Sequence, residues 1–252
     1  MNFEANIDFA RRLDSEDPLR DMRQSFYIPE DTIYMDGNSL GVLSIETEQR
    51  VKDALEDWKN LGIKGWLQGN PPWFYYAEEV GEKAAPLVGA KPKEVVATGG
   101  TTLNIHALLA AFYQPEGKRT KILADALNFP SDIYAIKGFL KLKGYDPEHH
   151  LVLVHSQDGH QLAEEDIMAA MNDEVAVALL PTVLYRSGQL LDIPLLTQKA
   201  HEHGILIGFD ASHSAGAVPH HLHKHGVDFA MWCGYKYLNG GPGSTGFLYV
   251  RE

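Results

Sequence analysis

The chain has 252 residues, of which 44% are hydrophobic and 22% are charged, and its formal net charge is −12. This is the composition of an ordinary globular protein, and it excludes collagen, coiled-coil and wholly disordered chains. The acidic excess argues against nucleic acid or an anionic membrane as the main partner, although backbone N–H groups can still hold a small anion.

The first sixty residues predict an N-terminal arm with helices. Residues 1–20 are rich in charge and lack the apolar core of a secretory signal, and no later stretch is long and apolar enough to span a bilayer. A cytoplasmic location is therefore expected. Residues 32–35 predict a short strand, and residues 44–60 predict a helix whose apolar face includes Trp58, which we expect in the core.

From residue 94 onward, short apolar segments alternate with amphipathic segments of helical period. The predicted strands are 94–98, 121–125, 151–155, 175–181, 205–210, 229–233 and 246–250. The predicted helices are 102–113, 131–142, 163–171 and 194–203. This pattern predicts an α/β fold with a mostly parallel, seven-stranded sheet covered by helices on both faces. We expect an arm over residues 1–60 and the α/β domain over residues 61–252, with any ligand beyond the carboxyl ends of the strands.

Two of the loops at that edge begin helices. In the first, two glycines precede Thr101 and Thr102, and free N–H groups with two hydroxyls at a helix N-terminus suit an anion. The alternative is that the threonines only cap the helix. In the second, Phe129 precedes Pro130 and Asp132, and its ring is suited to stack on a flat ligand. The alternative is an ordinary helix start with Phe129 in the core.

Two further loops carry ionisable groups. Asp210 ends a very apolar strand, where a carboxylate needs a cationic or hydrogen-bonding partner such as a protonated heterocyclic nitrogen, and His213 can brace it. The alternative is an aspartate that caps the next helix. Lys236 follows another apolar strand between Tyr235 and Tyr237, and a partly desolvated amine suits a lysine that forms a Schiff base. The alternative is a surface lysine.

Together these loops offer an anion cradle, a stacking ring, an acid and an amine, which are the groups that pyridoxal phosphate requires. At these residues the chain closely resembles the kynureninases, fold-type I pyridoxal phosphate enzymes in the class-V branch of the aspartate aminotransferase superfamily. The resemblance runs from about residue 30 to the last residue. It rests on residues 37–41 (GNSLG), 129–136 (FPSDIYAI), 187–189 (SGQ), 208–213 (GFDASH) and 226–239 (GVDFAMWCGYKYLN).

The resemblance implies roles for the residues around the cofactor. Lys236 would join the cofactor aldehyde and move protons, and Tyr235 would bind the phosphate and assist proton transfer. Asp210 would pair with the pyridinium nitrogen, supported by Asp132 and His213.

Further residues follow from the same resemblance. Phe129 would stack on the ring, and Thr101 and Thr102 would lie at the phosphate. Ser39 and Trp66 would line the substrate pocket. The chain departs from the family at Pro181, where relatives tend to carry a hydroxyl residue, and no cofactor contact is assigned to the neighbouring Thr182.

The implied activity is that of a hydrolase, which cleaves the Cβ–Cγ bond of L-kynurenine, and of 3-hydroxykynurenine, to anthranilate or 3-hydroxyanthranilate and L-alanine in tryptophan catabolism and NAD biosynthesis. A homodimer is implied as well. Members of the family continue through a smaller C-terminal domain, so we expect that domain to be absent here and full activity to be lacking. Two alternatives stay open: another class-V lyase such as a cysteine desulfurase, and a non-catalytic fragment.

The histidine-rich segment 220–225 raises the alternative of a metal site. Its spacing matches no closed zinc pattern, so we expect no metal and a solvated helix or loop on the far side of the sheet. The single cysteine, Cys233, cannot form an internal disulfide, which fits a reducing compartment. Cys233 and Trp232 lie in an apolar strand, and both are predicted to be buried.

Overall fold

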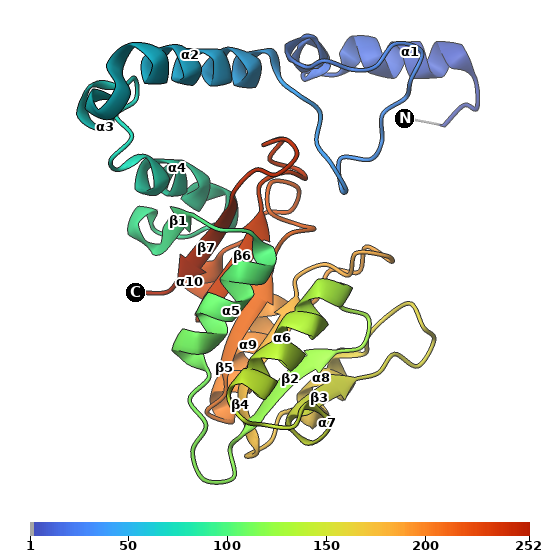
Figure 1. The fold of residues 1–252 in the computed structure, drawn as a ribbon. Helices are drawn as coiled ribbons and strands as arrows, with labels where there is room; N and C mark the ends of the chain where they lie inside the picture. The colour runs from blue at the N-terminus through green and yellow to red at the C-terminus, as the bar shows by residue number, and fades with distance from the viewer. Residues whose placement is uncertain (1–2) are drawn as a thin grey trace.

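Seven apolar segments of the chain form one sheet in the computed structural model, which describes residues 3–252 (Figure 1). The strands are β1 Val95–Ala97, β2 Lys121–Asp125, β3 Leu151–Val154, β4 Val175–Pro181, β5 Leu206–Asp210, β6 Phe229–Cys233 and β7 Gly246–Val250. Their order is β1-β7-β6-β5-β4-β2-β3. β7 is antiparallel to both of its neighbours and the other pairs are parallel, which confirms the predicted mostly parallel sheet.

The helices of this sheet domain cover both of its faces. They are α4 Tyr76–Ala84, α5 Thr101–Phe112, α6 Pro130–Leu142, α7 Pro147–His150, α8 Glu164–Ala170, α9 Ile193–Glu202 and α10 Leu222–His225, with the 3-10 helices η3 Ala85–Val88 and η4 Pro92–Glu94. In Figure 1, α5 and α6 lie side by side over one face. Their apolar side chains pack with Ile122 and Leu179, whereas those of α8 and α9 pack with Leu123 and Leu180 on the other face. Because successive strand residues point to opposite faces, these strands must be apolar throughout.

The N-terminal segment contains α1 Ile7–Glu16, η1 Arg20–Ser25, α2 Ile45–Leu61, η2 Gly62–Lys64 and α3 Gly65–Gln68. The predicted helix at 44–60 is confirmed as α2, and the Ser44 side chain caps it by accepting a hydrogen bond from the Thr47 N–H. In Figure 1, α1 and α2 extend beyond the end of the sheet at which the N-terminal segment joins it. No helix in the described part of the chain has the length and apolarity needed to cross a membrane.

Two expectations for the N-terminal segment are wrong. Trp58 is 67% exposed rather than in the core, because α2 lies beyond the end of the sheet and its apolar face is left open by the described residues. Residues 32–35 form no strand, since no other segment among residues 3–252 supplies the ladder of backbone hydrogen bonds that a strand needs. Ile33 and Met35 are almost fully exposed there.

The carboxyl ends of the parallel strands place the four informative loops at one edge of the sheet. Asp210 pairs in register with Pro181 on one side and Met231 on the other. Cys233, at the end of β6, pairs with Gly246, and Gly246 accepts a hydrogen bond from the Thr98 N–H. The loop before α5 therefore lies next to the loop after β6, although about 130 residues separate the two loops in sequence.

The close contact between β5 and β6 predicts a sensitive glycine. A Cβ on Gly208 would lie 1.9 Å from the Phe229 ring, which is fully buried. We expect Gly208→Ala to lower the free energy of unfolding by about 1–3 kcal/mol, because a packed core cannot absorb the added methyl group. Urea denaturation measures this change. Gly37→Ala is the control, since nothing lies within 4 Å of its added Cβ, and equal stability of the two variants would contradict the prediction.

Candidate active site

Lys236 is buried at the sheet edge and its amine is hydrogen-bonded to a histidine. The side chain follows β6 and is 8% exposed. Its Nζ lies 2.7 Å from Nε2 of His213, which comes from the turn after β5. The same Nζ is 5.6 Å from the centre of the Phe129 ring and 5.8 Å from that of Tyr235. The structure thus brings together residues from three of the four loops around one amine, and the alternative of a surface lysine is wrong.

Two carboxyl groups lie next to this amine. Asp210 and Asp132 are both buried, and the Asp210 Oδ1 accepts a hydrogen bond of 2.7 Å from the Ser212 N–H. Burial, together with the charge and hydrogen bond of Asp210, raises the pKa of Asp132 to about 9. Asp132 is therefore protonated at neutral pH, and it can donate a hydrogen bond to its neighbour Asp210. The alternative role for Asp210, a cap on a following helix, is wrong because residues 211–219 form turns rather than a helix.

His213 is neutral in this setting. Burial, and next the charge of Lys236, lower its pKa to about 4. A lysine amine always has a hydrogen to donate, so the Nε2 of His213 accepts it and the imidazole proton is assigned to Nδ1. His213 therefore stays neutral beside Lys236, and its hydrogen bond holds the amine in place at the sheet edge.

Phe129 forms one wall of a small hollow beside these groups. The hollow is also lined by Asn128, Tyr185, Asp210 and His213. The Phe129 ring is 42% exposed and meets Tyr185 edge to face at 5.1 Å, so the alternative of a core phenylalanine is wrong. An exposed ring beside a carboxylate gives a flat ligand one face to stack on and an acid at its rim.

Sequence analysis missed Asn128 and Tyr185. The Nδ2 of Asn128 is buried and finds no partner among the described residues, while its Oδ1 accepts from the Phe129 N–H. Polar atoms of this kind are costly in a folded protein unless a ligand or water meets them. The sequence signal for Asn128 was its place directly before the stacking ring.

The N-terminus of α5 is open to a ligand. Gly100 occupies the N-cap position and supplies no side chain to the first turn, and Gly99 adopts a positive φ of 56° that favours glycine. Thr101 and Thr102 are the first two helical residues, so the alternative that they cap the helix is wrong. The unpaired N–H groups of this turn and the two hydroxyls provide donors for an anion.

Tyr235 is half-buried at the start of the Lys236 loop. Burial, followed by the neighbouring Cys233, raises the pKa of its phenol to about 12. The hydroxyl therefore keeps its proton at neutral pH and can serve as a hydrogen-bond donor. Cys233 and Trp232 are buried in β6, as predicted.

The turn at residues 37–41 packs directly against the lysine loop. The Gly41 N–H donates to the Tyr235 carbonyl at 2.8 Å. A Cβ on Gly41 would lie 2.3 Å from the Lys236 carbonyl, so only glycine allows this approach. Ser39 is thereby placed near the site, although its own side chain is exposed.

The structure does not bring Trp66 to the lysine. Trp66 belongs to α3 and is 46% exposed, and its aromatic neighbours among the described residues are Trp73 and Phe74. In Figure 1, α3 lies at the far end of α2 from the 37–41 turn. A role for Trp66 in a substrate pocket remains a prediction.

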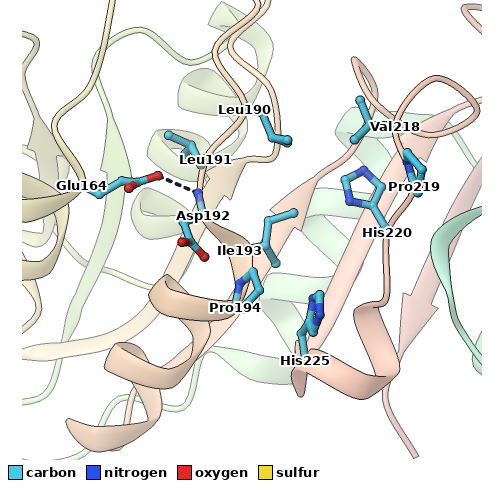
Figure 2. Close-up of a pocket in the computed structure, with 10 residues that line it drawn as sticks. All are labelled: Glu164, Leu190, Leu191, Asp192, Ile193, Pro194, Val218, Pro219, His220 and His225. Carbon is cyan, nitrogen blue, oxygen red and sulfur yellow. Dashed lines mark hydrogen bonds between the residues drawn. The ribbon is translucent and has the colours of Figure 1, made fainter.

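A second pocket lies away from these residues and contains neither Lys236 nor Asp210 (Figure 2). It lies between the start of α9 and the segment 218–220. His220 lines it but is only 5% exposed, so the expectation that the histidine-rich segment is solvated is wrong for this residue. No cluster of three or more metal-ligating side chains occurs within residues 3–252.

Sequence comparison connects the chain with one family. The profile of the Aminotransferase class-V family matches residues 33–252. Three curated relatives are each named "Kynureninase". The protein of Geobacillus thermodenitrificans is 62% identical, and the match covers 99% of this chain and 58% of the relative. The protein of Shouchella clausii is 58% identical, and the match covers 97% of this chain and 57% of the relative. The protein of Bacillus anthracis is 54% identical, and the match covers 99% of this chain and 58% of the relative. The chain therefore spans somewhat more than half the length of these relatives.

Solved structures share the fold. A C-DES variant with glycine covalently linked to its PLP cofactor superposes with a TM-score of 0.77, at 16% identity over 91% of this chain and 59% of its own. The apo cysteine desulfurase of Thermococcus onnurineus NA1 gives a TM-score of 0.74, at 20% identity over 92% and 56%. At these identities the comparison establishes the architecture alone, and it confirms the predicted fold class.

The buried Asp132 predicts an unusual dependence of stability on pH. The folded chain keeps the Asp132 proton to about pH 9, whereas the unfolded chain loses it near the ordinary pKa of 3.8. This group therefore lowers the free energy of unfolding as the pH rises through that interval. In Asp132→Asn, which cannot ionise, the decrease between about pH 5 and about pH 9 should be smaller by at least about 2 kcal/mol.

Urea unfolding across this pH range checks the prediction. Asp14→Asn is the matched control, since Asp14 is an exposed carboxylate on α1. Parallel pH profiles for the parent chain and Asp132→Asn would show that Asp132 does not hold its proton in the folded chain.

Proposed function

The chain belongs to the class-V aminotransferase family, and from this premise we propose that it binds pyridoxal phosphate through Lys236 and carries the cofactor site of a kynureninase. The observation that carries the proposal is the buried Lys236 amine. It is hydrogen-bonded to a neutral His213 and lies above an exposed aromatic ring, with a carboxyl pair beside it.

The residues at the sheet edge fit the parts of this cofactor. The open N-terminus of α5, with Thr101 and Thr102, suits the phosphate. The exposed Phe129 ring suits the face of the pyridine, and Asp210 suits its protonated nitrogen. The unpartnered Nδ2 of Asn128 in the same hollow offers a donor to a ring substituent. Of these groups, the Asn128 Nδ2 is a buried polar atom without a partner in the described chain, as expected at a ligand site.

When bound, pyridoxal phosphate supplies an aldehyde that condenses with amines and an electron-withdrawing ring that stabilises negative charge at a substrate carbon. Lys236 would provide the amine that holds the cofactor, and the same group would serve as the base for the proton on the substrate Cα. His213 holds the amine in place through its hydrogen bond. Asp210 would pair with the positive charge of the ring, with the protonated Asp132 beside it, and Tyr235 keeps a hydroxyl proton for donation.

We propose L-kynurenine, or 3-hydroxykynurenine, as the substrate, with hydrolytic cleavage of the Cβ–Cγ bond. The names of the relatives at 54–62% identity support this reaction. A desulfurase is the second candidate, because solved structures of similar fold carry that name. That activity needs an accessible cysteine thiol to take up sulfur. Cys233, the single cysteine, is buried in β6 and 4% exposed, which favours the first reaction.

We also propose that two chains associate and that they work in the cytoplasm. The open apolar face of α2, formed by Val51, Leu55 and Trp58, supports association, because an exposed patch of this kind commonly marks an interface. The unpaired thiol of Cys233 supports a reducing compartment.

Covalent capture of the cofactor tests the site. The chain mixed with pyridoxal phosphate should gain a visible absorption band, and borohydride should bleach it and fix one cofactor to Lys236, as read by mass spectrometry. Lys236→Met should lose both signals, because methionine has no amine. Lys199→Met is the control, since Lys199 lies on the surface of α9 in an ion pair with Glu202. An unchanged band in Lys236→Met, or no band in the parent chain, would overturn the assignment.

A product assay tests the reaction. The cofactor-loaded chain is incubated with L-kynurenine and, separately, with L-cysteine, while anthranilate fluorescence, alanine and sulfide are measured. We expect anthranilate and alanine in equal amounts and no sulfide, because hydrolysis of one Cβ–Cγ bond yields one of each product. Sulfide without anthranilate would favour the desulfurase, and a loaded chain that forms neither product would support the non-catalytic alternative.

A further inference from the structure

A buried chain of hydrogen bonds runs behind the strand that carries Asp210. The Oγ1 of Thr182 lies 3.2 Å from the Asp210 carbonyl oxygen and 2.6 Å from the Oγ of Ser214. The Nε2 of His220 lies 2.7 Å from the same Oγ. Thr182 and Ser214 are fully buried and His220 is 5% exposed. We call these three residues the Thr182 network.

Each hydroxyl of this chain has one hydrogen and more than one acceptor within reach. A carbonyl oxygen can only accept, so Thr182 can donate to the Asp210 carbonyl, and Ser214 can donate to the Ala211 carbonyl, which lies 3.2 Å from its Oγ. Either hydroxyl can donate across the 2.6 Å contact between them. The direction of the bond between Ser214 and the Nε2 of His220 depends on the imidazole tautomer. In every arrangement, loss of one of the three side chains leaves a buried polar atom without a partner.

The network is joined to both sides of the proposed cofactor site. The Thr182 N–H also donates to the Asp210 carbonyl, at 2.9 Å, which doubles the link between the ends of β4 and β5. Ser214 follows His213 directly, and its N–H donates to the Ala211 carbonyl. The peptide of Asp210 and the turn that carries His213 are therefore held by the same buried groups, although none of the three touches Lys236.

We propose that Thr182, Ser214 and His220 are positioning residues, which fix the Asp210 carboxylate and the His213 imidazole around the Lys236 amine. His220 also forms part of the wall of the second pocket (Figure 2), so the network extends from that pocket to the lysine site. The effect of the network on binding of pyridoxal phosphate rests on the proposed function. Its effect on the position of the His213 imidazole does not.

Two matched pairs of variants test the network. Thr182→Val keeps the shape of the side chain and removes the hydroxyl, and Thr182→Ser restores it. His220→Leu removes the hydrogen-bond partner of Ser214, and His220→Gln keeps a side chain that can donate or accept. Far-UV circular dichroism and thermal unfolding identify any variant that does not fold. If Thr182→Val fails to fold, the His220 pair decides the outcome.

The first readout is the imidazole titration of His213, followed by NMR in the cofactor-free chain and assigned with His213→Asn. The parent value should lie near pH 4. Thr182→Val and His220→Leu should shift it upward by about half a pH unit or more, because the imidazole is less firmly held beside Lys236. Thr182→Ser and His220→Gln should return it toward the parent. A merely structural network would lower the melting temperature and leave this titration unchanged, and that result would overturn the proposal.

The second readout is the Kd for pyridoxal phosphate from visible absorbance. Thr182→Val and His220→Leu should raise the Kd about five-fold, in line with the loss of one buried hydrogen bond, with recovery in the conservative variants. If His213 shifts but no variant, nor the parent, binds pyridoxal phosphate, the proposed function fails while the positioning network stands. If the parent binds and neither the Kd nor the His213 titration responds, the positioning proposal fails alone.

Discussion

The Lys236–His213 hydrogen bond at the sheet edge is the interaction on which the site depends. An amine and an imidazole 2.7 Å apart cannot both carry a charge in a desolvated setting, and the low pKa of His213 shows which of them stays neutral. The adjacent carboxyl pair is governed by the same desolvation, because burial and the charge of Asp210 raise the pKa of Asp132 to about 9, so that Asp132 stays protonated. The protonation states of His213 and Asp132 are thus set by the chain itself, without a ligand.

The strand order explains how this edge assembles. β7 is inserted antiparallel between β1 and β6, so its first residue, Gly246, bonds to the segment before α5 and pairs with the end of the strand that leads to Lys236. The N-terminus of α5 and the Lys236 amine therefore lie on neighbouring elements of the sheet. β4 and β5 bring Thr182 and Asp210 together in the same way, and buried hydrogen bonds connect Thr182 to Ser214, the residue after His213.

The N-terminal segment contributes differently. Its turn at 37–41 reaches the lysine loop through a single backbone hydrogen bond and a glycine that allows close approach. The rest of the segment extends away from the sheet, and the apolar face of α2 is open in the described part of the chain. The relatives are longer than this chain, which covers 58% of the Geobacillus thermodenitrificans protein.

The sequence by itself determined the seven strands of the sheet and the helices that cover it, because burial on both faces requires apolar strands, and it indicated the edge at which loops carry the polar residues. It placed Phe129, Asp210, His213 and Lys236 at one edge for that reason. Only the tertiary structure decided that Trp58 is exposed, that residues 32–35 remain unpaired, and that His220 is buried behind Asp210. Side-chain burial and hydrogen-bond partners depend on segments distant in sequence. A local sequence pattern does not determine which distant segment will pack against a given side chain.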